Sequence, residues 1–533
     1  MERLRGMVFV FMMLMLVLIF SGCGQSSNQN GQTADGGASQ DGPRIAYYAH
    51  FSEPYIDLDP SVEYSNGIVT LHNIYETLTR YNDDTQEVEP LLAESWEVDE
   101  DGMEWTFNIR QGVVFHDGAS LTAEVVKKSI DRTINLNMGA AYIWESVSEI
   151  QVLDEYTVKF VLEYAAPIDL IASAAYASFI MSPDAAEQGS NWFNAGNASG
   201  TGPYKLQRVV AGEEVLMTRF DDYWQGWSDN QYDHILIRKV VESTSRRQLV
   251  ENSEAQITAG LSTSDINAMR NNPEVAVIEA AAWKNVIGFF NTQKPPLDNV
   301  NFRKAMSYAY PYEEVVENVR EGLATQSYGL IPAGLWGYDE TLFQYTYNLD
   351  KAQEYLNLSG IDPDTVKLEL TFTSGDEGHR NAAQLYQVNL RRLGIEMDIR
   401  EMTWDNLWEK SKSSSLPERQ DVLIMYWWPD FPSPSSWLWG LVHSEEEVLF
   451  NLSYINEPAL DEKVEEGDML SAIDRYQAEA IFREVQEEVV EQAYMLHMYD
   501  DMTIYVVTND FGGFSPNPSY EGVVFFYDTY YQE

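Results

Sequence analysis

The sequence has very little cysteine and comparatively little positive charge. Its one cysteine among 533 residues is Cys23, so no disulfide can form within the chain, and its position after an apolar N-terminal run argues against a catalytic thiol. Lys and Arg number 34 against 84 Asp and Glu, a formal charge of −50. Such a surface repels nucleic acid, so no nucleic-acid partner is expected. We interpret the acidity as solubility, or adaptation to a salty or acidic medium, rather than as a surface for a cationic ligand.

Sequence patterns for catalysis and metal binding are also lacking. The seven histidines are scattered without metal-ligand spacing. The chain has no Gly-x-Ser-x-Gly elbow, no His-Glu-x-x-His helix and no phosphate-binding glycine loop. A secreted glycoside hydrolase stays as an alternative because acids are abundant, yet no pair of acids stands out by spacing. We therefore expect a protein without metal or cofactor that is not an enzyme.

The longest apolar run lies at the N-terminus and is too short to span a bilayer comfortably. It extends from Met7 to Phe20, follows two arginines and leads into Ser21-Gly22-Cys23, the layout of a secretory signal. The junction resembles the lipobox of bacterial lipoproteins, in which the cysteine becomes the acylated first residue, although Phe20 stands where leucine is usual. We expect a signal peptide over residues 1–22, lipidation at Cys23 and an extracytoplasmic protein anchored to the membrane.

A polar segment follows the cysteine. Residues 24–42 consist mostly of Gly, Ser, Gln, Asn and Asp without apolar periodicity, so they cannot bury enough surface to fold. Residues 23–43 are therefore predicted to be a flexible tether between the anchor and a globular body.

The body shows strand and helix patterns in alternation, which predicts a mixed α/β fold. Three segments have period-two alternation: Trp105, Phe107 and Ile109; Val158, Phe160 and Leu162; and Leu368, Leu370 and Phe372. A helix is expected after Thr122 as N-cap, with Val125, Val126 and Ile130 inward.

A second helix and a strand are expected near the C-terminus. The helix has an apolar stripe formed by Ala478, Ile481, Phe482, Val485 and Val489. Four polar residues are predicted to lie off this stripe: Glu484, Gln486, Glu487 and Glu488. Tyr494 to Val507 is predicted to be a buried strand that returns to an earlier sheet. In Gly200-Thr201-Gly202-Pro203, glycine is expected to supply unusual backbone angles before Tyr204 starts a strand.

A series of segments from about residue 44 to the C-terminus resembles the extracellular binding proteins of the oligopeptide and dipeptide import family, solute-binding protein family 5. The matching segments include residues 58–60 (LDP), 73–78 (NIYETL), 90–96 (PLLAESW), 105–113 (WTFNIRQGV), 115–118 (FHDG), 200–204 (GTGPY), 222–224 (DYW), 302–305 (FRKA) and 430–432 (DFP). Most of these segments are expected to be scaffold rather than ligand contacts.

The resemblance implies an α/β, two-lobed periplasmic-binding-protein fold of class II type, with an extra domain inserted in the first lobe. The first lobe would comprise residues 44–80, 192–285 and 499–533, the inserted domain residues 81–191, and the second lobe residues 286–498. The lobes would close on a ligand by a hinge motion. The implied function is that of a substrate-binding lipoprotein, expected to be a monomer, which captures short peptides and delivers them to a membrane permease of an ABC importer.

The run Met425 to Pro432 is apolar and aromatic except for one acid, Asp430. In peptide-binding members of the family, the aspartate in this place pairs with the ligand's α-ammonium group. The alternative is that Asp430 accepts hydrogen bonds from turn amides ahead of Pro432. Relatives that prefer sugars carry this aspartate too, so the position does not decide the ligand.

Two backbone segments match the places where the family lines a bound peptide. At Tyr426, Trp427 and Trp428 the peptide would add as an extra strand. The second segment, along the other side of the peptide, would be Glu63, Tyr64, Ser65 and Asn66. The alternative is that these four residues form an ordinary surface loop. His379 and Arg380 are candidates for a ligand carboxylate, with a solvated helix start as the alternative.

Departures from the family pattern leave the ligand open. Trp428 is bulky where many relatives have a small residue, Ile424 stands where an arginine can help bind a carboxylate, and Tyr310-Pro311-Tyr312 replaces a common helical segment. Trp404 belongs to a tryptophan-rich stretch whose flat rings also suit sugars. An oligosaccharide is therefore the leading alternative ligand.

Overall fold

The computed structural model describes residues 42–532. The predicted signal peptide, the lipidation site Cys23 and nearly all of the predicted tether lie outside these residues. Within them, no helix combines the length and apolar character needed to cross a membrane.

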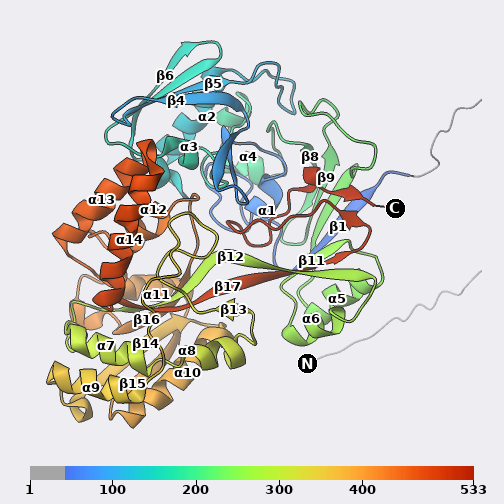
Figure 1. Ribbon diagram of the computed structural model, residues 1–533. Helices are drawn as coiled ribbons and strands as arrows, with labels where there is room; N and C mark the ends of the chain where they lie inside the picture. Colours follow the sequence, from blue (N-terminus) through green and yellow to red (C-terminus); the bar gives the residue numbers. More distant parts are fainter. Residues whose placement is uncertain (1–41, 533) are drawn as a thin grey trace, which may run out of the picture. The chain divides into compact units, whose positions relative to one another are not determined.

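One 11-stranded mixed sheet runs through the molecule, in the order β15-β14-β16-β12-β17-β11-β1-β10-β9-β8, with β13 pairing β17 (Figure 1). One end of the sheet holds β1 (Ile45–His50), β8 (Tyr204–Val210), β9 (Glu214–Arg219), β10 (His234–Lys239) and β11 (Ile257–Ala259). The other end holds β13 (Ala324–Thr325), β14 (Lys367–Thr373), β15 (Glu396–Met402) and β16 (Val422–Trp427). We refer to these two ends, with the elements packed on them, as the first and the second lobe.

Two long antiparallel strands, β12 (Val275–Phe290) and β17 (Met495–Thr508), connect the lobes. The start of β12 and the end of β17 pair beside β11, whereas the end of β12 pairs with β16. Their ladder shifts register between Ala281 and Asn285 and again between Val286 and Ile287. The expected buried strand from Tyr494 to Val507 is thus confirmed as β17, and it returns to a sheet begun earlier.

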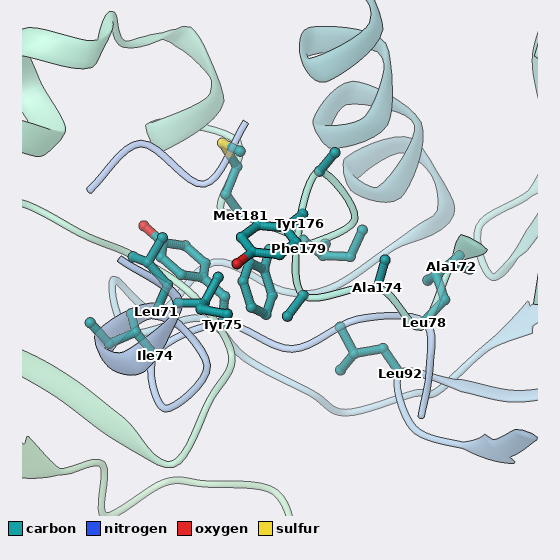
Figure 2. Close-up of a cluster of buried hydrophobic side chains, with 14 of the residues drawn as sticks. Leu71, Ile74, Tyr75, Leu78, Leu92, Ala172, Ala174, Tyr176, Phe179 and Met181 are labelled. Atoms are coloured by element: carbon teal, nitrogen blue, oxygen red, sulfur yellow. The ribbon is translucent and has the colours of Figure 1, made fainter. Parts of the chain in front are cut away.

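A separate four-stranded sheet, β4-β5-β7-β6, lies within residues 81–191. Its strands are β4 (Ala93–Val98), β5 (Glu104–Ile109), β6 (Val147–Asp154) and β7 (Thr157–Leu162), accompanied by α2 (Ala123–Leu136), η1 (Ala141–Trp144), α3 (Ile168–Ile171) and η2 (Ala185–Glu187). Its hydrophobic core is continuous with that of the first lobe. Figure 2 shows the junction, where Tyr75 and Leu78 lie with Leu92, Tyr176 and Phe179 in one buried cluster.

The remaining elements cover the two lobes. Strands β2 (Thr79–Asn82) and β3 (Glu87–Pro90) pair with each other where residues 81–191 begin, and α4 (Ser190–Asn194) lies where they end. The first lobe also has α1 (Ile68–Leu71), α5 (Ser243–Glu251), α6 (Thr263–Met269), β18 (Phe511–Gly512), η6 (Phe526–Asp528) and β19 (Tyr530–Tyr531). The second has α7 (Val300–Ala309), α8 (Tyr312–Glu314), η3 (Val315–Val319), α9 (Leu349–Ser359), η4 (Pro363–Thr365), α10 (Glu377–Arg392), α11 (Trp404–Ser411), η5 (Leu416–Glu418), α12 (Ser435–Leu441), α13 (Pro458–Ile473) and α14 (Arg475–Glu491).

The period-two patterns predicted their strands correctly, since β5, β7 and β14 bury the expected residues. Helix α2 has Thr122 at its N-cap position, although the threonine side chain makes no capping bond. In α14 the stripe is buried as expected except for Ile481, which is only partly buried, and the prediction for Gln486 was wrong. This side chain is buried because its amide oxygen accepts from the Ile331 backbone N–H and its amide nitrogen donates to the Gly337 carbonyl.

The turn at Gly200 and Gly202 also differs from its prediction. Neither glycine has a positive φ. Glycine is needed there because the backbone of Ile74 lies against the turn: a Cβ on Gly200 would stand 2.1 Å from the Ile74 carbonyl oxygen. The Gly202 N–H donates to that same oxygen, and Tyr204 then begins β8 as expected.

Replacing Gly200 with alanine is expected to lower the free energy of unfolding by about 1–3 kcal/mol, because the new methyl group must push apart two hydrogen-bonded backbone segments. Chemical denaturation measures this change. Gly189→Ala is the matched control, since Gly189 has extended backbone angles and no atom lies within 4 Å of the place its new methyl group would take. Equal stability of Gly200→Ala and the parent protein would contradict the close approach.

Candidate functional site

A cavity of about 770 Å³ lies between the lobes. Its walls come from the first lobe, from the connecting strand β12, from the second lobe around β16 and α11, and from the C-terminal residues 518–521. We call this cavity the ligand chamber. Both lobes contribute to its lining.

A row of aromatic rings lines the chamber and joins the lobes. Trp404 stacks on Tyr426 at 6.4 Å between ring centroids, and Tyr426 lies 5.5 Å from Trp428. Trp428 in turn lies 6.4 Å from Tyr64, which belongs to the first lobe. Rings at these separations form a flat apolar wall suited to apolar side chains or to sugar faces.

The backbone of β16 has one free edge beside this wall. On one side, Ile424 to Trp427 pair with β12 in antiparallel register, with Tyr426 opposite Val286. On the other side, β14 pairs only with Val422 and Leu423. Within the described part of the chain, no strand continues that pairing along residues 424–427. The unpaired amide and carbonyl groups of this edge are able to hydrogen-bond an extended ligand backbone.

Asp430 follows this strand and is only 4% exposed. The Tyr64 hydroxyl donates to its Oδ1 at 2.8 Å, and the Tyr142 hydroxyl lies 2.8 Å from the Tyr64 oxygen. Burial raises the pKa of Asp430 to about 6, against the lowering effect of the two tyrosine hydroxyls. Among residues 42–532 no backbone amide donates to the Asp430 carboxylate, and no Lys or Arg pairs with it. Asp430 lines a smaller adjoining cavity rather than the ligand chamber.

In the first-lobe segment 63–66, three residues line the chamber and one stabilises the loop from within. Tyr64, Ser65 and Asn66 line the chamber. Glu63 is 3% exposed and its carboxylate accepts the backbone N–H groups of Asp57, Ser65 and Gly67. Glu63 therefore holds the loop in shape, and the chamber lining does not include it.

The predicted cationic pair lies outside the chamber lining. His379 is 2% exposed in the second lobe, and burial lowers its pKa, which favours the neutral ring. Arg380 donates from Nε and Nη2 to Glu401 at 2.6 and 2.7 Å and also pairs with Glu377 on the surface of α10. Tyr310 and Tyr312, which stand where the family has a common helical segment, are buried in the core of the second lobe.

Sequence reasoning missed a lysine at the hinge. Lys284, in β12, lines the chamber and donates to Glu521 at 2.7 Å, with Asp501 at 3.3 Å. Burial by itself would lower the pKa of Lys284, but the two carboxylates outweigh burial and raise it. The available signal was a single lysine in a mostly apolar crossing strand, whose other polar residues are Glu279 and Asn285. Lys412, at the end of α11, is the other lysine that lines the chamber.

No group of three or more His, Cys, Asp or Glu side chains within residues 42–532 has the arrangement of a metal site. The chamber offers a free strand edge, aromatic rings, and a lysine, Lys284, that is balanced by acids.

Comparison with known proteins agrees with this geometry. The family model of the bacterial extracellular solute-binding proteins, family 5 Middle, matches residues 87–447. The "Probable D,D-dipeptide-binding periplasmic protein DdpA" of Escherichia coli K12 is 27% identical over 481 residues, covering 87% of this chain and 90% of the relative. Di/tripeptide-binding protein 2 of Pseudomonas aeruginosa is 25% identical over 494 residues, covering 86% and 90%.

A solved structure shows the same fold. The periplasmic binding protein DppA of Helicobacter pylori, in complex with the peptide STSA, superimposes with a TM-score of 0.74 at 22% identity, covering 92% of this chain and 98% of that one. The two-lobed α/β architecture expected from the sequence is thereby confirmed. The match of the family model over most of the chain shows that this protein belongs to the bacterial extracellular solute-binding proteins of family 5.

Proposed function

We propose that this protein captures short peptides between its lobes and delivers them unaltered to the membrane permease of an ABC importer. The observation that carries the proposal is the free edge of β16 at Ile424–Trp427, which lies beside the ligand chamber. Main-chain hydrogen bonds along such an edge recognise any peptide backbone and ignore side-chain identity. The peptide-binding relatives and the peptide complex named above support this ligand class.

Asp430 is proposed to pair with the ligand's α-ammonium group. A buried carboxylate without a cationic partner is costly, and a charge-assisted bond to an ammonium group would offset that cost. Tyr64, which now donates to Asp430, comes from the opposite lobe. We propose that this bond opens with the lobes, so that the carboxylate can meet a ligand before they close.

Peptide affinity is expected to fall roughly tenfold from pH 7 to pH 5. The α-ammonium stays charged over this range, whereas Asp430, with a pKa of about 6, changes from mostly ionised to mostly protonated. Isothermal titration calorimetry of a tripeptide at the two pH values measures the change.

Protein stability does not confound this measurement. The folded-state pKa of Asp430 lies above its ordinary value of 3.8, so ionisation of this group costs stability as pH rises and protonation at pH 5 does not unfold the chain. The Asp430→Asn variant is the control and should lose the pH dependence. An identical slope in the variant would contradict the assignment.

An oligosaccharide is the second candidate ligand, favoured by the row Trp404, Tyr426 and Trp428 along the chamber. Stacked rings bind the flat faces of sugars. Mass spectrometry of the small molecules that co-purify with the protein, followed by calorimetry with those compounds, separates the two. Peptides in the chamber are the expected result, and sugars without peptides would replace the proposal.

We further propose that the protein acts as a monomer by binding rather than catalysis. Incubation with peptide and glycan libraries tests the absence of catalysis, since sustained product formation at sub-stoichiometric protein would show an enzyme.

We also propose membrane anchoring through acylated Cys23. Fractionation of cells that make the Cys23→Ser form tests the anchor, because the protein should then leave the membrane fraction.

A further inference from the structure

A second cavity, of about 190 Å³, adjoins the ligand chamber and shares Trp427, Leu449 and Phe450 with it. One side is formed by residues 142–146 and 164–171, between the strands of the smaller sheet and the first lobe, and the other by the second lobe from β16 to α13. A water molecule takes up about 30 Å³, so this space holds several waters or the end of one long side chain.

The charges around the second cavity are all of one sign. Glu145, Asp430, Glu445 and Asp468 line it, and the lining includes no Lys, Arg or His. Glu445 accepts the backbone N–H groups of Leu449, Phe450 and Asn451, whereas Asp430 accepts from the Tyr64 hydroxyl. Among residues 42–532, Asp468 and Glu145 likewise have only a hydroxyl neighbour each, which leaves most of their acceptor capacity free.

Asp468 is 8% exposed, and no Lys or Arg of residues 42–532 forms an ion pair with it. The Ser435 hydroxyl is a polar neighbour of Asp468 that lowers its pKa. Glu145 comes from the opposite wall and is held by the Tyr164 hydroxyl at 3.1 Å. Burial raises the pKa of Asp468 to about 6. The Ser435 hydroxyl opposes this rise, and the negative charge of Glu145 adds to it. Glu145 is exposed and Asp468 is nearly buried, so the charge of Glu145 makes the ionised form of Asp468 still less favourable unless a cation lies nearby.

The remaining walls are aromatic. Tyr164 and Trp439 are parallel, with centroids 6.3 Å apart, and Phe450 lies 5.9 Å from Tyr142. Ring faces attract ammonium and guanidinium groups, and they do so more strongly where water is excluded. An anion would meet four carboxylates here, whereas an organic cation would meet complementary charge and complementary faces.

We infer that the second cavity is a subsite for a cationic side chain of the bound ligand, a lysine-like ammonium or an arginine-like guanidinium, received by Asp468 and Glu145. This inference rests on the proposed function and deepens it: the preferred peptides carry a basic residue near the end that lies beside Trp427 and Phe450. Asp430, proposed for the α-ammonium group, lines the same cavity, and the side-chain cation is assigned to two other acids of that lining, Asp468 and Glu145.

The test uses three tripeptides that differ in one side chain. Lys-Ala-Ala, Arg-Ala-Ala and norleucine-Ala-Ala are titrated calorimetrically into the full protein, because norleucine matches the lysine chain without its charge. Lys-Ala-Ala should bind at least about tenfold more tightly than norleucine-Ala-Ala. The arginine peptide shows whether ammonium or guanidinium is preferred.

The variant Glu145→Gln/Asp468→Asn should reduce this lysine preference to less than threefold while norleucine-Ala-Ala keeps its affinity. Glu149→Gln/Glu466→Gln removes the same charge from exposed positions on β6 and α13 and should retain the preference. No lysine preference in the parent protein, or the same preference in Glu145→Gln/Asp468→Asn, would overturn the inference.

Failure of the proposed function has a different signature. If none of the tripeptides binds, peptide capture is wrong, and crystals soaked in n-butylammonium chloride decide the subsite independently. Density for butylammonium between Asp468 and Glu145 would support the cation subsite without peptide binding. An empty second cavity in such crystals would overturn it.

Discussion

Replacing Asp430 with asparagine is expected to weaken tripeptide binding by about 1.5–3 kcal/mol, or roughly tenfold to a hundredfold. Asparagine keeps the size of the side chain and removes the charge that the proposed ammonium contact requires. Calorimetry with trialanine at pH 7.5 measures the change. At that pH Asp430 is ionised in the parent protein, because its pKa of about 6 lies well below.

Two controls keep this result specific. N-acetyl-trialanine has no ammonium group, so it should bind the parent protein and the asparagine variant with similar, weak affinity. The thermal stability of the variant should equal or exceed that of the parent, because burial penalises the ionised carboxylate. Unchanged trialanine affinity would exclude the ammonium role of Asp430.

Replacing Arg132 with alanine is expected to lower the free energy of unfolding by about 3–5 kcal/mol. Arg132 in α2 meets Asp59 of the first lobe through two parallel bonds, Nη1 to Oδ1 and Nη2 to Oδ2, each 2.7 Å long. The two side chains are only 9% and 0% exposed. The Ser190 hydroxyl and the Ser61 N–H also donate to Asp59. Loss of the guanidinium leaves a buried carboxylate without a counter-charge, which is the costly outcome.

Chemical denaturation of a matched set tests this account. Lys127→Ala removes a partly exposed i,i+4 pair with Asp131 on the same helix, and it should cost less than about 1 kcal/mol. Asp59→Asn/Arg132→Met removes both charges and should be more stable than Arg132→Ala. If Arg132→Ala costs no more than Lys127→Ala, the pair is not the brace between α2 and the first lobe.

Short-range patterns were enough to predict the regular elements. The strands β5, β7 and β14 follow from period-two alternation, because one face of each meets a core. Gln486 shows the limit of such patterns. Its polarity predicts an exposed position, but two backbone groups from residues about 150 positions away provide hydrogen bonds that make its burial possible.

The chamber lining was predicted only in part, because it is assembled from distant segments. Resemblance to the family singled out Tyr64 and the β16 residues, and the structure brings them to one cavity. Arg380 follows a buried histidine in α10, and the rotation of that helix, set by tertiary packing, turns the arginine to the surface. The local signal at Lys284 did not reveal its role, because its partner Glu521 lies 237 positions further along the chain.

The path of β17 has a consequence for the order in which the protein assembles. The first-lobe core includes Tyr505, Val507 and Phe511, and continues through residues 520–526, so it gains its last members only when the end of the chain is available. The second-lobe cores need almost nothing beyond Met498 and Tyr499. A chain that emerges from its N-terminus can therefore complete the later-encoded lobe before the earlier one. Loss of the final thirty or so residues would leave the beginning of the protein, not its end, without a finished interior.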